Sequence, residues 1–187
     1  MAALFARSAN TLYRAAIVCA LLGITAAICA PMIFIRTAYG GDVDEAIEQP
    51  VAFDHRHHVR DDGIDCVYCH DTVETSAFAG YPSTARCMGC HGQVWPDSSE
   101  LAPVRDSWMT HTPIQWRRVT ALPAHVYFHH GVHVSNGIAC AECHGDVQDM
   151  PRIERAHRMT MDFCLDCHRR HVGRAISRLT TCSACHR

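Results

Sequence analysis

The sequence has no excess of positive charge and no run of basic residues. Its 17 basic residues are balanced by 19 acidic ones, and the formal net charge is −2. Proteins that bind nucleic acid neutralise phosphates with clustered basic side chains, so this balance argues against that class. Signals for β-strands are also few. The sequence therefore predicts a domain made mostly of helices and loops.

Cysteine and histidine are abundant instead, with 12 and 15 residues among 187. Ten of the cysteines fall into five C-x-x-C-H motifs, numbered 1 to 5 in chain order. The motifs are Cys66, Cys69 and His70; Cys87, Cys90 and His91; Cys140, Cys143 and His144; Cys164, Cys167 and His168; and Cys182, Cys185 and His186. Two cysteines at this spacing reach the vinyl groups of one porphyrin, and the histidine supplies the proximal ligand to its iron. The sequence predicts five covalently bound haem c groups.

Zinc and disulfide bonds are the alternative uses of so many cysteines. A single C-x-x-C pair in a cytosolic chain favours zinc or a redox dithiol, but here histidine follows all five pairs, which zinc does not require. A disulfide scaffold would need the same thiols to be free to pair. Five haems within residues 53–187 leave too little chain for an ordinary apolar core, so we expect the porphyrins themselves to form the core.

A repeat organises the haem region. Residues 53–70 read FDHRHHVRDDGIDCVYCH, and residues 128–144 read FHHGVHVSNGIACAECH, with one extra residue in the first copy. A further C-x-x-C-H motif follows each copy. The repeat predicts two dihaem modules, at about 53–92 and 128–168, and a fifth haem at 182–186.

Three other segments have an expected conformation or role. Residues 80–83, Gly-Tyr-Pro-Ser, predict a turn that leads into a short helix carrying haem 2. Residues 154–168 contain no glycine or proline and predict a helix that runs into haem 4. Residues 93–127 lie between the modules and carry all three tryptophans. They are either a loop whose indoles cover porphyrin edges or a docking surface for a partner subunit.

The second axial ligands are sought among the histidines that are not proximal. These are His55, His57, His58, His111, His125, His129, His130, His133, His157 and His171. The repeat aligns His55 with His130, and His58 with His133. Each pair is spaced by three residues, so one helical turn can direct its members to different haems. Two histidines have no counterpart in the other copy and are expected on the surface: His57 and His129.

Four distal histidines leave one haem without a second ligand. The candidates are Met161, Met150, Met159, His171 and His157. We expect Met161, with Met150 next, because Met161 lies too close to Cys164 for its own haem but within reach of a neighbouring iron. A haem with His and Met ligands has a higher potential than a bis-His haem and would act as an electron sink.

The N-terminal region predicts a membrane anchor. An uncharged apolar run fills almost all of residues 15–36 and is long enough to cross the hydrocarbon core as a helix. Residues 1–14 contain two arginines and no acidic residue, whereas acidic residues are frequent in the linker at 37–52. This asymmetry puts the N-terminus in the cytoplasm and the haem domain, residues 53–187, outside. A cleaved signal peptide is the alternative, but its apolar region would be shorter.

Several stretches carry a family resemblance. They read FxHxxHV…GIxCxYCH, AGYPSTARCMGCH, LPAHVYFHHGVHV, CHGDVQDM and MTMDFCLDCHR, and together cover about residues 50–168. They resemble the pentahaem cytochrome c subunit of alternative complex III, a quinol:electron-acceptor oxidoreductase. The resemblance implies a periplasmic haem domain on a single inner-membrane helix. It also implies partners: polytopic quinol-site subunits, an iron–sulfur subunit and a monohaem cytochrome c. Three histidines fall outside the family pattern: His57, His129 and His171.

A further resemblance concerns the paired histidines. Small tetrahaem class III cytochromes carry a similar H-x-x-H before a haem site. This implies that His55 serves haem 1 while His58 reaches a different haem, and that His130 and His133 divide in the same way.

The expected activity is electron conduction. Haems with two axial ligands have no open position on iron, which disfavours substrate chemistry there. We expect a membrane-anchored relay, not an enzyme on its own, that passes electrons from quinol oxidation to a periplasmic carrier or oxidase. The alternative is a stand-alone membrane-anchored quinol dehydrogenase that feeds a periplasmic reductase. Two other classes are a multihaem reductase with a vacant iron position and a purely structural haem-rich linker.

Overall fold

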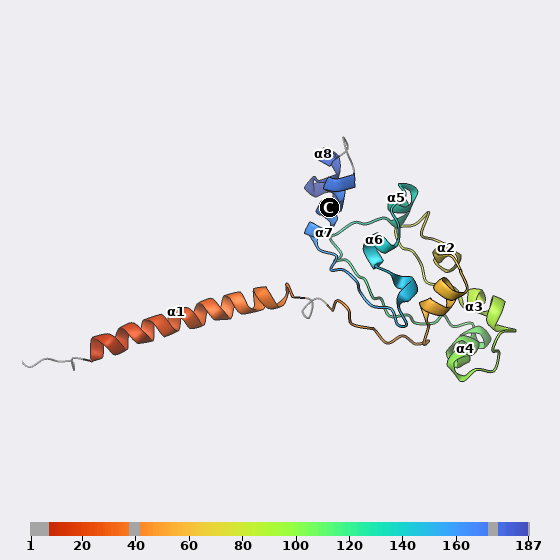
Figure 1. Ribbon diagram of the computed structural model, residues 1–187, viewed down its shortest axis with the longest axis horizontal. Helices are drawn as coiled ribbons and strands as arrows, with labels where there is room; N and C mark the ends of the chain where they lie inside the picture. Colours follow the sequence, from red (N-terminus) through yellow and green to blue (C-terminus); the bar gives the residue numbers. More distant parts are fainter. Residues whose placement is uncertain (1–7, 38–41, 172–175, 187) are drawn as a thin grey trace, which may run out of the picture. The chain divides into compact units, whose positions relative to one another are not determined.

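The computed structural model describes residues 8–37, 42–171 and 176–186, and it divides into two compact units, Met1–Asp42 and Val43–Arg187. The first unit contains one helix, α1 (Ala9–Phe34) (Figure 1). The helix begins earlier than the predicted residues 15–36. No glycine or proline between Ala9 and Arg14 stops it from extending in that direction.

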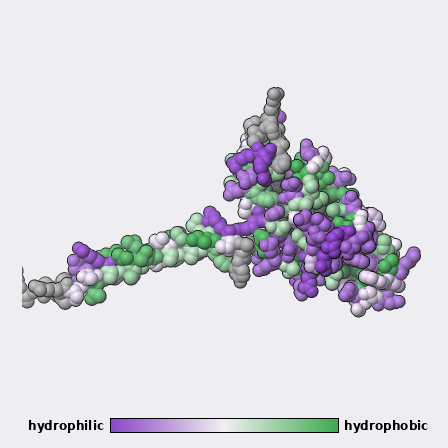
Figure 2. Space-filling model, viewed as in Figure 1, coloured by the Kyte–Doolittle hydropathy of each residue, from purple (hydrophilic) through white to green (hydrophobic). Residues whose placement is uncertain are grey.

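Helix α1 is apolar around its circumference, and none of its residues is buried. Figure 2 shows the visible face of the helix as mostly hydrophobic. The hydroxyl of Thr25 donates a hydrogen bond to the Leu21 carbonyl (2.9 Å), which satisfies this polar group within the helix itself. Within the described residues, α1 is the one helix long and apolar enough to cross a membrane. It is therefore a candidate membrane anchor.

The second unit consists of short helices joined by long irregular connections (Figure 1). They are η2 (Arg56–Asp61), α2 (Cys66–Cys69), α3 (Thr84–His91), η3 (Ser99–Leu101), α4 (Ala102–Thr110), α5 (His130–Ser135), α6 (Ala141–His144), η4 (Val147–Asp149), α7 (Met161–His171), α8 (Ile176–Leu179) and α9 (Cys182–Cys185). Segment η2 is π-helical, whereas η3 and η4 are 3-10 helices. The described part of the chain contains isolated β-bridges but no strand, which confirms the helix-and-loop prediction.

Very few side chains of this unit are buried. The buried hydrophobic residues among those described are Val51, Val73, Val104 and Met150. Among the described residues no large side chain is fully buried, and Trp95 is 60% exposed. Natural protein interiors are close-packed, so the polypeptide alone does not form one here. This confirms the expectation that the chain lacks an ordinary apolar core.

The turn predicted at residues 80–83 does not form, and these residues make an irregular connection that leads into α3. Gly80 adopts a φ of +79°, and a Cβ atom at this position would lie 2.7 Å from the Thr72 hydroxyl oxygen. Only glycine combines this conformation with such a close approach. The chain then enters α3 through Ser83, its N-cap residue. This connection therefore leads directly from the haem 1 motif to the haem 2 motif.

The predicted helix over residues 154–168 is wrong in its first half, because α7 begins only at Met161. The preceding residues form β-bridges with the start of the unit. The bridges are Val43 with Arg155 and Ala46 with Glu154. Tertiary pairing overrides the local helical preference of this stretch. The same bridges hold the part of the predicted linker from Val43 onward against the rest of the unit.

Candidate haem-binding sites

All five C-x-x-C-H motifs adopt the same local structure. In each motif the two cysteines lie within, or immediately before, one turn of helix, in α2, α3, α6, α7 and α9. Residues three apart in a helix share a face, so the two sulfur atoms of each motif lie on one side of the turn. None of the ten cysteines is disulfide-bonded, and all are at least partly exposed. This is the arrangement that attachment to two vinyl groups of one porphyrin requires.

Most of these helices are only one turn long, and isolated helices of that length are unstable. Local caps and tertiary hydrogen bonds hold them. The Asp65 carboxylate accepts a hydrogen bond from the Val67 amide (3.0 Å) at the start of α2. At the end of α9, the Cys185 carbonyl accepts one from the Tyr127 amide (2.8 Å).

Four proximal histidines each face a second imidazole. The ring pairs, with centroid distances and interplanar angles, are His58–His91 (5.9 Å, 63°), His130–His144 (6.3 Å, 9°), His133–His168 (6.2 Å, 18°) and His125–His186 (5.6 Å, 24°). A metal bound by imidazole lies about 2 Å from the nitrogen. Two rings whose centroids are about 6 Å apart therefore leave room for one metal atom between them. The residues fit a haem iron held by two histidines.

The remaining proximal histidine, His70, has His55 as its neighbour. Burial is the main cause that lowers the pKa of His55 to about 4. The neighbouring imidazoles of His70 and His58 lower it further. The ring is therefore neutral at physiological pH, which is the form that binds metals. Its Nδ1 atom is buried without a hydrogen-bond partner among the described residues. Such an orphaned buried nitrogen is costly, and a metal bound at Nδ1 itself would relieve the cost. Burial also lowers the pKa of His144.

Backbone carbonyls orient most of these imidazoles. In seven of the ten rings, Nδ1 donates a hydrogen bond to a carbonyl oxygen. The pairs are His70–Gly80 (2.8 Å), His91–Val94 (3.0 Å), His168–Leu179 (3.1 Å), His186–His125 (3.2 Å), His58–Asp54 (3.0 Å), His130–Ala77 (2.8 Å) and His133–His129 (2.9 Å). A hydrogen bond at Nδ1 fixes the tautomer and leaves Nε2 free to bind metal.

One phenylalanine in each repeat copy packs against both histidines that the sequence predicts as distal ligands. Phe53 stacks on His58 (4.3 Å, 24°) and meets His55 edge-on (4.8 Å, 80°). Phe128 stacks on His133 (4.5 Å, 28°) and meets His130 edge-on (4.7 Å, 88°). Such aromatic pairs favour defined orientations. The phenylalanine of the F-x-H-x-x-H frame is thus a positioning residue, a role that the repeat alone did not assign to it.

The other candidate ligands lie in different surroundings. Met161 is 63% exposed on α7, and Met150 is buried with its methyl group close to Gly145. The His157 ring stacks on Phe163 instead (5.4 Å, 28°), and the His171 side chain lies outside the described part of the chain. The ring that faces the fifth proximal histidine belongs to His125, which neither repeat copy contains. His57 and His129 are exposed, as expected.

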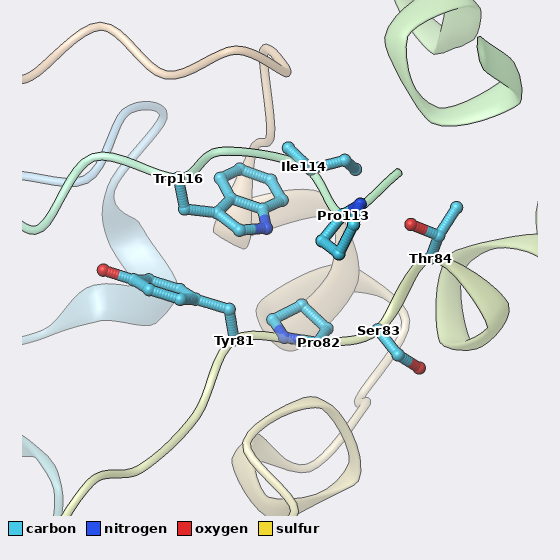
Figure 3. A pocket seen from close by; sticks show the side chains of 7 residues that line it. All are labelled: Tyr81, Pro82, Ser83, Thr84, Pro113, Ile114 and Trp116. Carbon is cyan, nitrogen blue, oxygen red and sulfur yellow. The ribbon is translucent and has the colours of Figure 1, made fainter. Parts of the chain in front are cut away.

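Two of the three tryptophans pack beside module 1. Trp116 stacks on Tyr81 (6.3 Å, 23°), and the two rings line one side of a cavity of about 250 Å³ (Figure 3). Trp95 stacks on His57 (5.6 Å, 10°), next to the distal histidine His58. These contacts place two indoles against module 1, and part of the predicted inter-module loop is helical, in η3 and α4. Trp108, at 46% exposure, takes no part in either stack.

Comparison with known proteins gives two matches. Residues 126–187 match the family of cytochrome c7 and related cytochrome c. The chain is also 31% identical over 163 residues to a protein of Nitratidesulfovibrio vulgaris described as the multiheme cytochrome c subunit of menaquinone reductase. The match covers 75% of this chain and 77% of the relative.

Proposed function

The chain belongs to the multihaem cytochrome c family, and we propose that it binds five haem c groups and relays electrons between a membrane quinone pool and an acceptor outside the membrane. The observation that carries the proposal is the set of five attachment motifs, four of which have their proximal histidine facing a second imidazole, while His55 lies within electrostatic reach of the fifth, His70. When bound, the haems supply reversible one-electron chemistry. The polypeptide supplies the ligands, their orientation and the spacing.

The proposed ligand set follows the ring pairs. Proximal His70, His91, His144, His168 and His186 are matched with distal His55, His58, His130, His133 and His125 for haems 1 to 5. His125 thereby replaces Met161, our expectation from the sequence. With all ten axial positions filled by histidine, the iron atoms have no open site. The proposal is therefore a relay and not an enzyme that acts on substrate at iron.

Helix α1 would anchor the haem domain to the inner membrane, with the N-terminus in the cytoplasm. The support is the apolar length of α1 and the excess of arginine before it. Within alternative complex III, the partners would be polytopic quinol-site subunits, an iron–sulfur subunit and a monohaem cytochrome c. A soluble electron carrier or an oxidase would accept the electrons. The alternative remains a stand-alone quinol dehydrogenase feeding a periplasmic reductase.

The relative's description raises a second possibility for the direction of flow. It names a menaquinone reductase, in which electrons leave a donor and reach the quinone. A relay whose haems are all bis-ligated conducts either way, because direction depends on the potentials of donor and acceptor. The same haem chain would then deliver electrons to menaquinone instead of receiving them from menaquinol.

Membranes that contain the full-length protein test the proposal. We expect added menaquinol to reduce its haem c, seen as growth of the reduced α-band, and polytopic subunits to co-purify. Re-oxidation of chemically reduced membranes by menaquinone would instead assign the relative's direction. A purified lone subunit that oxidises menaquinol would support the stand-alone dehydrogenase. A haem spectrum that responds to neither quinol nor quinone would contradict the relay altogether.

A further inference from the structure

The contacts among the five sites define a spatial order that differs from their order in the chain. We infer that the haems lie in single file in the order 2–1–3–4–5, so that haems 2 and 5 are the two ends of the relay. The inference rests on the proposed function for the presence of the haems, but not for the identity of donor or acceptor. The inference is based on two observations. Some pairs of sites take their ligands from the same helix, and the attachment cysteines of neighbouring sites lie close to one another.

Haems 1 and 2 are neighbours because one short segment supplies a ligand to each. His55 is the N-cap residue of η2 and lies beside His70, whereas His58, within η2, faces His91. The attachment cysteines agree with this placement. Cys69 of haem 1 lies within electrostatic reach of both haem 2 cysteines, Cys87 and Cys90.

Haems 3 and 4 are neighbours for the same reason in the second repeat copy. His130 and His133 lie on α5 and face His144 and His168, respectively. Of the attachment cysteines, Cys143 of haem 3 lies close to both cysteines of haem 4. Each module is therefore a haem pair built on one turn of helix.

The two pairs meet through haem 1 and haem 3. The Gly131 amide, on α5, donates a hydrogen bond to the Ser76 carbonyl (3.1 Å), in the segment that follows the haem 1 motif. A Cβ atom at Gly131 would lie 2.5 Å from the Glu74 carbonyl oxygen, so the two segments are in direct contact. Cys66 of haem 1 lies within electrostatic reach of Cys140 of haem 3. Haem 1 thus lies between haem 2 and haem 3.

Haem 5 extends the file beyond haem 4. His168 of haem 4 donates a hydrogen bond from Nδ1 to the Leu179 carbonyl (3.1 Å), just before the haem 5 motif. Cys164 of haem 4 lies within electrostatic reach of Cys185 of haem 5. Residues 125–127 complete this end of the file, since Val126 bridges to His186 and supports the facing ring of His125.

Two matched variants of the full-length holoprotein test the order: His55→Met and His58→Met. Each replaces one distal histidine of the same segment, three residues apart, and a His/Met haem has a higher potential than a bis-His haem. The sample is poised with a chemical reductant so that only the altered haem is reduced and diamagnetic. The electron spin relaxation of the remaining ferric haems is then compared with that of the fully oxidised protein.

The two orders predict opposite results. In the order 2–1–3–4–5, reduction of haem 1 in H55M slows the relaxation of two other haems, whereas reduction of haem 2 in H58M slows only one. In the chain order 1–2–3–4–5, the relaxation of one other haem slows in H55M and that of two other haems slows in H58M. This outcome would overturn the inference. No quinone enters the experiment, so failure of the proposed function would appear only in the membrane assay above.

A second measurement covers the case in which a variant fails to mature. The iron–iron distances in a structure of the unaltered holoprotein report the order directly. We expect iron 1 to lie nearer to iron 3 than iron 2 does, and iron 5 to have iron 4 as its nearest neighbour. An iron 2 that lies nearer to iron 3 than iron 1 does would contradict the single file.

Discussion

The chain produced without haem attachment is expected to remain unfolded over residues 43–187. Only four hydrophobic side chains are buried among the described residues. Each such side chain contributes about 1.5–3 kcal/mol, whereas ordering the backbone costs roughly 1–2 kcal/mol for every residue. One-turn helices add little stability of their own. Without the porphyrins, burial therefore cannot offset the loss of conformational entropy.

Limited proteolysis and circular dichroism can compare the haem-free chain with the holoprotein. The haem-free form is obtained by expression without the thioether-forming maturation machinery. We expect rapid digestion of the haem domain and no cooperative thermal transition in that form, while the holoprotein resists protease. A haem-free chain that unfolds in one sharp transition would show that the polypeptide has a sufficient core of its own.

Replacing His125 by alanine is expected to convert one haem in five to the high-spin, five-coordinate form. The His125 ring faces His186 at 5.6 Å, and residues 125–127 are fixed to the fifth motif by the Val126–His186 bridge and by the Tyr127 amide. Removing the ring leaves the iron of haem 5 without a sixth ligand. The other four haems keep both histidines, so the change is confined to one-fifth of the haem signal.

Met161→Leu is the matched control, because Met161 is the residue that sequence reasoning favoured and it is 63% exposed. Low-temperature EPR of the oxidised protein is the measurement. We expect a high-spin signal in His125→Ala and none in Met161→Leu. The opposite pattern would restore methionine as the fifth distal ligand and would return haem 5 to a higher potential.

The repeat explains why four of the proposed distal ligands were predictable from the sequence. His55, His58, His130 and His133 occur in a frame that appears twice, so their alignment separates them from ordinary surface histidines. The same frame contains Phe53 and Phe128, whose role as positioning residues became apparent only from their ring contacts. Local spacing is therefore informative wherever a proposed ligand lies in the same repeat copy as its partner histidine or the motif that follows it.

His125 was not accessible in this way, for a physical reason. It lies outside both repeat copies, and its partner His186 is 61 residues further along the chain. Only the tertiary contact between residues 125–127 and α9 brings the two rings together. The mistaken helix from Glu154 has a similar origin, because the long-range β-bridges with residues 43–46 decide the conformation of that stretch.

The central claim is that five porphyrins, each held by two histidines, form the interior of this protein. Haem quantification combined with an EPR spin count on the unaltered holoprotein tests it most directly. The account predicts five haem c per chain, all of them six-coordinate and low-spin. Fewer than five haems per chain, or a high-spin haem in the unaltered protein, would contradict it.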